Sequence, residues 1–202
     1  SISDAIMTTR IDAQAGDIND VIACPVIQVA LVVLRISWTE QCETALKLGH
    51  QLGEDAESPA GAMLTVATKT RESMNVLVDQ VKTVRLPREE RQRLRSLVQH
   101  QLQSYEVCQQ LAEILRHYPA SIEQFEWQQQ LRTYTSFVYR QHGGGGDWVA
   151  SVKVGRAEFS YGCEFLAGQQ VRLVATPLTD RCYVSLAQAV RAFDGGAGVG
   201  PA

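Results

Sequence analysis

The stretch RLVATPLTDRCY, residues 172–183, decides the fold. Val171–Ala175 predicts a short strand, and Thr176-Pro177 ends it because proline has no backbone N–H to give to a sheet. Thr179 or Asp180 can then cap a helix that covers about Arg181–Phe193. A strand followed directly by a helix indicates that this part of the chain combines both kinds of secondary structure.

The residues just upstream alternate with a period of two, which predicts a β-hairpin. Apolar and polar residues alternate over Val149–Val154 and again over Phe159–Phe165, with a turn near Gly155. The aromatic residues in the second run are explained better by one packed face of a hairpin than by a platform for stacking nucleic-acid bases.

Four consecutive glycines, Gly143–Gly146, precede this hairpin. Glycine loses more backbone entropy on folding than any other residue, so such a run is unfavourable inside a helix or strand. We therefore predict a flexible joint here. Before it, the apolar residues recur every three or four positions, which is typical of amphipathic helices. The predicted helices cover Val26–Leu48, Ala62–Arg85, Arg88–His117 and Ile122–Thr135, with a surface loop over Gln51–Gly61.

Composition excludes several classes of protein. The chain has 202 residues, 45% of them apolar, and a net charge of -3, which argues against disorder and against a dedicated nucleic-acid binder. No apolar run is long enough to span a bilayer, and no secretory signal is recognisable. The chain lacks an initiator Met and stops in a glycine-rich stretch, so we expect it to be part of a longer protein.

Motifs for catalysis or metal binding are not found in the sequence. The five cysteines are widely spaced without a C-x-x-C pair, which predicts neither disulfides nor zinc and favours a reducing compartment. The four histidines are scattered, and there is no G-x-S-x-G. We predict no catalytic and no metal-binding residues. The basic stretch Arg85–Arg95 is interrupted by glutamates and is interpreted as a solvated helix start rather than a phosphate-binding patch.

The last three residues, Gly200-Pro201-Ala202, match only the first positions of the phosphate-binding motif G-x-x-x-x-G-K-[ST]. Taken alone, they fit an unstructured tail better. The surrounding residues change this interpretation, because Arg172–Tyr183 resembles the segment that opens the first AAA+ module of dynein heavy chains. In that family a helix follows, then Gly-Gly, then G-P-A-G-T-G-K-[ST]; here the helix is followed by Gly195-Gly196 and Gly200-Pro201-Ala202.

Other segments resemble the same family in the same order. Phe159–Leu166 is similar to its F-x-Y-G-[FY]-E-[YF]-L hairpin strand, and the wording favours the cytoplasmic over the axonemal type. Phe125–Trp127 with Gln130–Arg132 resembles F-E-W-L-S-Q-[LM]-R at the end of the dynein linker, and Gln28–Trp38 resembles a linker helix.

The resemblance implies an α+β chain in three parts. Residues 1–142 would be the C-terminal part of the helical linker, 143–146 the glycine joint, and 147–202 the start of the first AAA+ module, cut at the phosphate loop. The family is an ATP-driven, minus-end-directed microtubule motor, in which the linker swings as a lever. The adenine wall and the start of the phosphate loop would be formed by Leu173, Val174, Ala175, Thr176, Pro177, Leu178, Gly200, Pro201 and Ala202.

The resemblance also implies partners and a location. These are ATP with Mg²⁺, the rest of the AAA+ ring, microtubules contacted through other regions, and the dynein intermediate, light intermediate and light chains. The location would be the cytoplasmic microtubule cytoskeleton or a cilium. The phosphate-loop Lys and Ser/Thr are absent, so we expect no tight ATP binding and no hydrolysis by these residues alone. The alternative is a non-catalytic helical scaffold or a partner-binding fragment.

Overall fold

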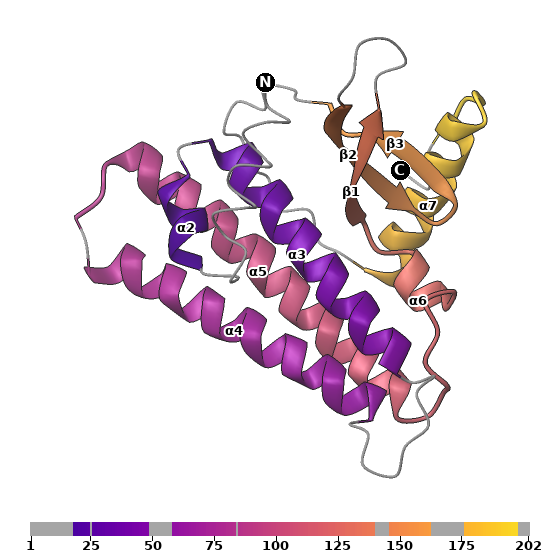
Figure 1. Cartoon of the computed structure of the whole chain (residues 1–202), viewed down its shortest axis with the longest axis horizontal. Coiled ribbons are helices and arrows are strands. Elements are labelled where there is room, and N and C mark those ends of the chain that lie inside the picture. The colour runs from indigo at the N-terminus through magenta and orange to yellow at the C-terminus, as the bar shows by residue number, and fades with distance from the viewer. Residues whose placement is uncertain are drawn as a thin grey trace, which may run out of the picture. The chain divides into compact units, whose positions relative to one another are not determined.

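The computed structural model describes residues 18–24, 26–48, 58–83, 85–139, 146–162 and 176–197. The chain divides into two compact units, Ser1–Ile122 and Glu123–Ala202. Where described, the first unit is helical, and the second holds a three-stranded antiparallel sheet with two helices (Figure 1). The predicted α+β class is confirmed.

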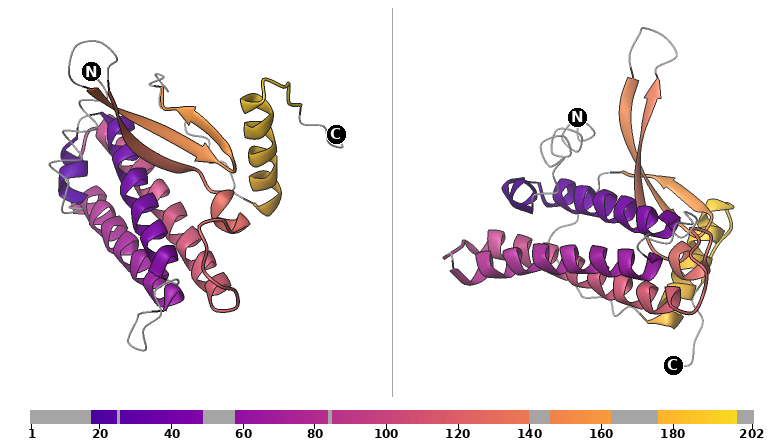
Figure 2. Two further views of the ribbon diagram at one scale, coloured as in Figure 1. Left: turned by 45° about the vertical axis from the view of Figure 1, so that its right-hand side comes forward. Right: turned by 60° about the horizontal axis from the view of Figure 1, so that its bottom comes forward.

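Three long helices build the first unit: α3 (Ile27–Leu48), α4 (Pro59–Thr83) and α5 (Arg88–Leu115). They run side by side, and α4 and α5 share the most extensive contact (Figure 2). The predicted helices over these ranges are confirmed, with ends that differ by a few residues. A short helix, α2 (Ile18–Ala23), precedes them and was not predicted.

Apolar stripes on the long helices form the core of the first unit. Each fully buried Leu, Ile or Met side chain contributes roughly 1.5–3 kcal/mol relative to the exposed side chain. Pro87 stands at the N-cap of α5 and separates it from α4. The largest fully buried apolar side chains here are Ile36, Leu46, Met63, Leu77, Leu97 and Leu111.

The basic start of α5 is largely solvated, as predicted. Arg88, Arg91 and Arg95 are exposed. Arg93 is the exception, because its half-buried guanidinium donates hydrogen bonds to the backbone oxygens of Ile22 and Cys24 at the end of α2. These last carbonyls of a helix have no partner within the helix, so Arg93 fixes α2 against α5.

The sheet of the second unit has the order β1-β2-β3, formed by β1 (Arg132–Tyr139), β2 (Gly146–Val154) and β3 (Ala157–Ser160). The predicted turn of the β2–β3 hairpin is confirmed at Gly155, whose φ of 57° is in the left-handed region that glycine adopts readily. Part of the second predicted strand, including Phe165, lies outside the described residues, as does the predicted strand Val171–Ala175.

The predicted helix over Ile122–Thr135 is wrong. Only a single turn forms, α6 (Phe125–Gln128), and the chain then enters β1, which is rich in the β-branched and aromatic residues that favour strands. Trp127 is fully buried, whereas Phe125 and Leu131 are exposed and are not core contacts. Helical spacing over so few residues did not distinguish one turn from a helix.

The glycine run does not act simply as a joint. Gly146 is the first residue of β2 and pairs with Tyr139 of β1. A Cβ atom at Gly146 would lie 2.5 Å from the Val138 carbonyl oxygen, so only glycine fits there. The prediction that no glycine of the run lies in a strand is therefore wrong for Gly146, while residues 143–145 lie outside the described part. The two units divide earlier, between Ile122 and Glu123.

Helix α7 (Pro177–Arg191) packs on β2 and β3. It begins four residues before the predicted Arg181. Across the described ranges, the helices all fall short of what spanning a bilayer requires.

Candidate functional site

Nine residues were predicted to bind a nucleotide, and those that the structure describes lie at the start of α7. Three of the nine fall within the described residues: Thr176, the backbone of Pro177, and Leu178. The remaining six lie outside them: Leu173, Val174, Ala175, Gly200, Pro201 and Ala202.

A capping box fixes the start of α7. Thr176 has an extended backbone with φ -130° and ψ 157°, and its hydroxyl oxygen accepts a hydrogen bond of 3.2 Å from the Thr179 N–H. In return, the Thr176 N–H donates to the Thr179 hydroxyl oxygen at 2.7 Å. Pro177 occupies the first helical position, where a missing N–H costs nothing. The N-cap is therefore Thr176, and the predicted caps at Thr179 or Asp180 are wrong.

Exposed apolar surface lies beside this cap. Leu178, in the first turn of the helix, is 72% exposed. Asp180, in the same turn, has a carboxyl whose pKa is raised by partial burial. The start of α7 thus offers backbone groups and an uncovered leucine, which suit the binding of a flat apolar ring rather than a chemical step.

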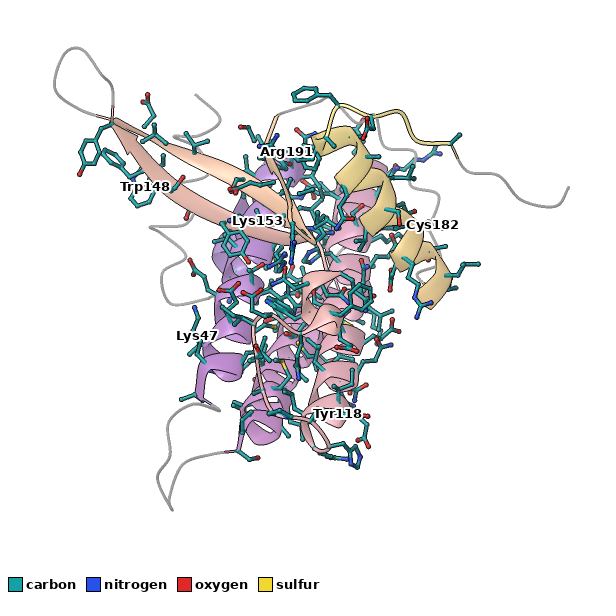
Figure 3. The ribbon with its side chains drawn as sticks, turned by 90° about the vertical axis from the view of Figure 1, so that its right-hand side faces the viewer. Lys47, Tyr118, Trp148, Lys153, Cys182 and Arg191 are labelled. Carbon is teal, nitrogen blue, oxygen red and sulfur yellow. The ribbon has the colours of Figure 1, made fainter. Side chains whose placement is uncertain are left out.

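The opposite side of α7 is seated on the hairpin turn. A Cβ at Gly155 would lie 3.3 Å from Cγ1 of Val184 and 3.2 Å from Nε2 of Gln188. Val184 is buried, whereas Cys182 is exposed on the side of α7 turned away from the strands (Figure 3). Burial on one side therefore holds α7 in place and leaves its other side available.

The end of α7 turns sharply. Phe193 has a φ of 61°, the left-handed conformation that glycine usually supplies after a helix. The Asp194 N–H donates to the Ala189 oxygen at 2.8 Å, and the Phe193 N–H donates to the Val190 oxygen at 3.1 Å. This closure is a Schellman motif. Nothing in the sequence predicted it, because the residue at the left-handed position is not glycine.

Metal-binding clusters are not apparent in the described ranges, where no three His, Cys, Asp or Glu side chains come close enough to hold an ion. His100 is buried in α5, and burial, assisted by the positive charge of Arg35, holds the pKa of its imidazole well below the usual value.

The chain is similar to known proteins in two comparisons. The family described as the hydrolytic ATP binding site of dynein motor region matches residues 161–202, which include all of α7. The cytoplasmic dynein heavy chain of Drosophila melanogaster is 33% identical over 185 residues, 89% of this chain and 4% of that protein. The chain belongs to the dynein heavy-chain family.

Axonemal dynein heavy chains are similar too. Axonemal heavy chain 8 of Mus musculus is 31% identical over 175 residues, 87% of this chain and 3% of that protein. Axonemal heavy chain 1 of Mus musculus is 42% identical over 85 residues, 41% of this chain and 2% of that protein. The chain therefore spans only a few per cent of the length of these dynein relatives. The alternative of a non-catalytic helical scaffold or a partner-binding fragment is not favoured.

Two residues of the dynein-like F-E-W…Q-L-R string are structural in the second unit. Trp127 is fully buried, and Arg132 is only 4% exposed. The Arg132 guanidinium donates to Oε1 of Gln128 at 2.8 Å and to the backbone oxygen of Gly155 at 2.7 Å. The Gly155 N–H donates in turn to the backbone oxygen of Gln128 at 2.7 Å. The sequence predicted no role for Arg132, which drew notice only as part of this string.

Proposed function

We propose that this chain is part of an ATP-driven motor that moves toward microtubule minus ends. The observation that carries the proposal is the match of residues 161–202 to the hydrolytic ATP-binding site of the dynein motor region, with the capped start of α7 inside the matched range. The chain covers about 4% of the cytoplasmic relative, so the motor activity is that of a complete heavy chain.

In this proposal the adenine wall is formed by residues 173–178. Thr176 holds the turn between the preceding segment and α7 through the capping box. Leu178 offers its exposed side chain to one face of the purine, because burying apolar surface against a ring is favourable. Gly200, Pro201 and Ala202 begin the loop that wraps the phosphates.

The residues present fit the adenine end of ATP better than its phosphate end. An uncovered leucine beside a rigid cap suits a purine, whereas no described cluster of acidic residues could hold Mg²⁺. The phosphate-loop Lys and Ser/Thr, which would neutralise the phosphates and hold Mg²⁺, are not among these 202 residues. When bound in a complete heavy chain, ATP with Mg²⁺ would supply the phosphoryl-transfer chemistry.

The helical unit would be the C-terminal part of the linker. From the resemblance, residues 1–142 were assigned to the linker and 147–202 to the AAA+ module. The division of the chain between Ile122 and Glu123 supports a boundary between linker and module that lies earlier in the sequence. The partners would be the rest of the AAA+ ring, microtubules, and the intermediate, light intermediate and light chains. The names of the relatives, cytoplasmic and axonemal, support a microtubule-associated location in the cytoplasm or a cilium.

The test uses a complete heavy chain that carries this segment, and measures microtubule-stimulated ATPase rates. We expect Leu178→Ala to raise the Michaelis constant for ATP several-fold, because it removes apolar contact worth about 1 kcal/mol. Pro177→Gly should raise it as well by loosening the adenine wall. Microtubule affinity should change little in either variant.

Val190→Ala is the matched control, since Val190 is 58% exposed on the same helix but three turns away from Leu178. It should leave the Michaelis constant unchanged. An unchanged constant in Leu178→Ala and Pro177→Gly, or an equal rise in Val190→Ala, would refute the pocket assignment. A heavy chain without ATPase activity, with or without microtubules, would refute the motor itself.

A further inference from the structure

Two cysteines from different helices meet in the core of the helical unit. The sulfurs of Cys42 on α3 and Cys108 on α5 lie 3.6 Å apart, and both side chains are fully buried. The Trp38 indole N–H donates to the Cys108 sulfur at 3.2 Å. No sequence motif indicated this pair, because its members are 66 residues apart in the chain.

The two thiols are not equivalent. Hydrogen bonds from the Cys42 thiol and from the Trp38 indole lower the pKa of Cys108, against the opposing effect of burial. Burial raises the pKa of Cys42, and its hydrogen bond to Cys108 raises it further. Cys108 is thus the thiol that ionises first, and a thiolate is the reactive form of cysteine. One ionisable thiol beside a protonated one is the arrangement that a dithiol needs for stepwise oxidation.

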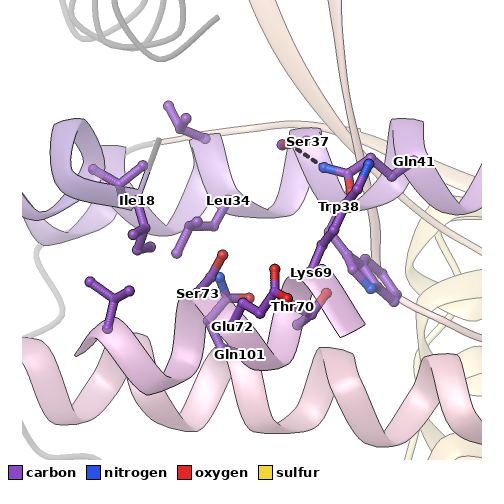
Figure 4. Close-up of a pocket in the computed structure, with 13 residues that line it drawn as sticks. Ile18, Leu34, Ser37, Trp38, Gln41, Lys69, Thr70, Glu72, Ser73 and Gln101 are labelled. Carbon is purple, nitrogen blue, oxygen red and sulfur yellow. Dashed lines mark hydrogen bonds between the residues drawn. The ribbon is translucent and has the colours of Figure 1, made fainter. Parts of the chain in front are cut away.

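A cavity brings small molecules close to this pair. About 420 Å³ of space lies between α3 and α4, and its lining includes Trp38, Gln101 and the exposed Lys69 and Glu72 (Figure 4). Trp38 contributes to the wall of the cavity and also contacts the Cys108 sulfur. The Trp38 side chain is therefore shared by the wall of the cavity and the thiol pair.

We propose that Cys42 and Cys108 are a reversible modification site, at which a small peroxide forms a disulfide that joins α3 to α5. The Cys108 thiolate attacks hydrogen peroxide, so that a sulfur–oxygen bond forms, the oxygen–oxygen bond breaks, and one water leaves after protonation. The Cys42 sulfur then attacks the Cys108 sulfenic acid, forming the sulfur–sulfur bond and releasing the second water. Two thiols lose two electrons, and one peroxide becomes two waters. Thiol reductants such as glutathione reverse the modification.

The two sulfurs are farther apart than in a disulfide. Bonded sulfurs are about 2.05 Å apart, so the observed pair has to close by about 1.5 Å for the bond to form. The bond would link the two helices across a long stretch of chain, which restricts the unfolded chain strongly. The site is in the helical unit and does not depend on the proposed nucleotide-binding function.

The test uses the 202-residue chain treated with hydrogen peroxide, then denatured, alkylated and digested with trypsin without reduction. Cleavage places Cys42 alone in peptide 36–47 and Cys108 alone in peptide 96–116, so a linked pair of these peptides identifies the bond by mass. We expect this linked pair, and its loss on reduction. Cys182→Ser is the matched control, because Cys182 is exposed, and it should keep the linked pair.

Equilibration in glutathione buffers gives a second measurement that needs no variant. If the folded helices hold the two sulfurs together, the effective concentration of one thiol with respect to the other should be at least about 30-fold higher in the folded chain than in concentrated urea. An equal or lower effective concentration in the folded chain would overturn the proposal. So would thiols that remain reduced under peroxide, or that form only mixed disulfides with glutathione.

Discussion

Arg132 provides the sharpest test of how the second unit is held together. Its guanidinium is buried and donates to Gln128 at 2.8 Å and to the Gly155 oxygen at 2.7 Å, with a longer contact of 3.3 Å to the Tyr134 hydroxyl. Arg132→Met keeps an unbranched side chain of similar length but removes the donors. The acceptors on Gln128 and Gly155 are then left without this partner.

The expected loss follows from these bonds. Hydrogen bonds from a charged donor contribute about 1.5–3 kcal/mol each. Removing the buried charge returns part of that free energy, because burying a guanidinium is itself unfavourable. We therefore expect Arg132→Met to lower the free energy of unfolding of the second unit by about 2–4 kcal/mol. The corresponding acceleration of amide exchange is about 30- to 1,000-fold where exchange follows unfolding.

The assay is native-state hydrogen exchange, followed by mass spectrometry, on peptides that cover β1 and β2. Peptides from α4 and α5 serve as an internal reference in the other unit. Arg156→Met is the matched control, because Arg156 is exposed next to Gly155, and it should change the free energy by less than about 0.5 kcal/mol. Equal exchange of β1 and β2 in Arg132→Met and wild type would refute the reasoning, as would acceleration of the same size in α4 and α5.

Three further changes test single features of the two units. Gly155→Ala should cost about 1–2 kcal/mol in thermal unfolding, because its φ of 57° is unfavourable for alanine, while Gly195→Ala, with nothing within 4 Å of its Cβ, should be neutral. Phe193→Gly should raise the free energy of unfolding of the second unit in urea by about 1 kcal/mol, because Phe193 has a left-handed φ of 61° and is 92% exposed. Phe193→Ala should bring no such gain. The folded state lowers the pKa of His100, so as the pH falls the unfolded chain takes up the imidazole proton before the folded chain does. The free energy of unfolding is therefore unaffected above about pH 6.5 and decreases below it by up to about 1.4 kcal/mol per pH unit. His100→Gln should flatten that acid limb in pH-dependent melts, whereas the exposed His117→Gln should retain it.

Helical periodicity predicted the first unit well because its helices are long. Over more than twenty residues in α3, α4 and α5, the apolar stripe repeats often enough to fix both the type of element and its buried side. The short helix α2 has only six residues, and its position depends on Arg93, which lies far away in the sequence. No local pattern carries that information.

The second unit was harder to predict because its decisive contacts are not local. Trp127 and Leu131 are four residues apart, which is a helical spacing, yet only Trp127 is buried. β1 forms because it pairs with β2 across the glycine run. The residue at position 146 has to be glycine, because the Val138 oxygen leaves no room for a side chain. This steric restriction exists only in the folded sheet. Propensity alone treats such a glycine as a break.

The candidate site was found by its residue string and not by physical spacing. Nothing in Gly200-Pro201-Ala202 alone distinguishes the start of a phosphate loop from a tail. The capping box could have been read from the sequence, since Thr176 precedes a proline and Thr179 stands three residues later, but both threonines and Asp180 are good caps by type. Only the extended backbone of Thr176 decides between them.

The contacts of Gly155 join three elements of the second unit. Its N–H and oxygen bind Gln128 and Arg132, and its α-carbon faces Val184 and Gln188 of α7. We therefore expect a displacement of α7 to affect the hairpin turn and, through the hydrogen bonds of Arg132, Gln128 of α6. In the proposed motor, the residues nearest the nucleotide and those that follow the helical unit would thus move as one connected body.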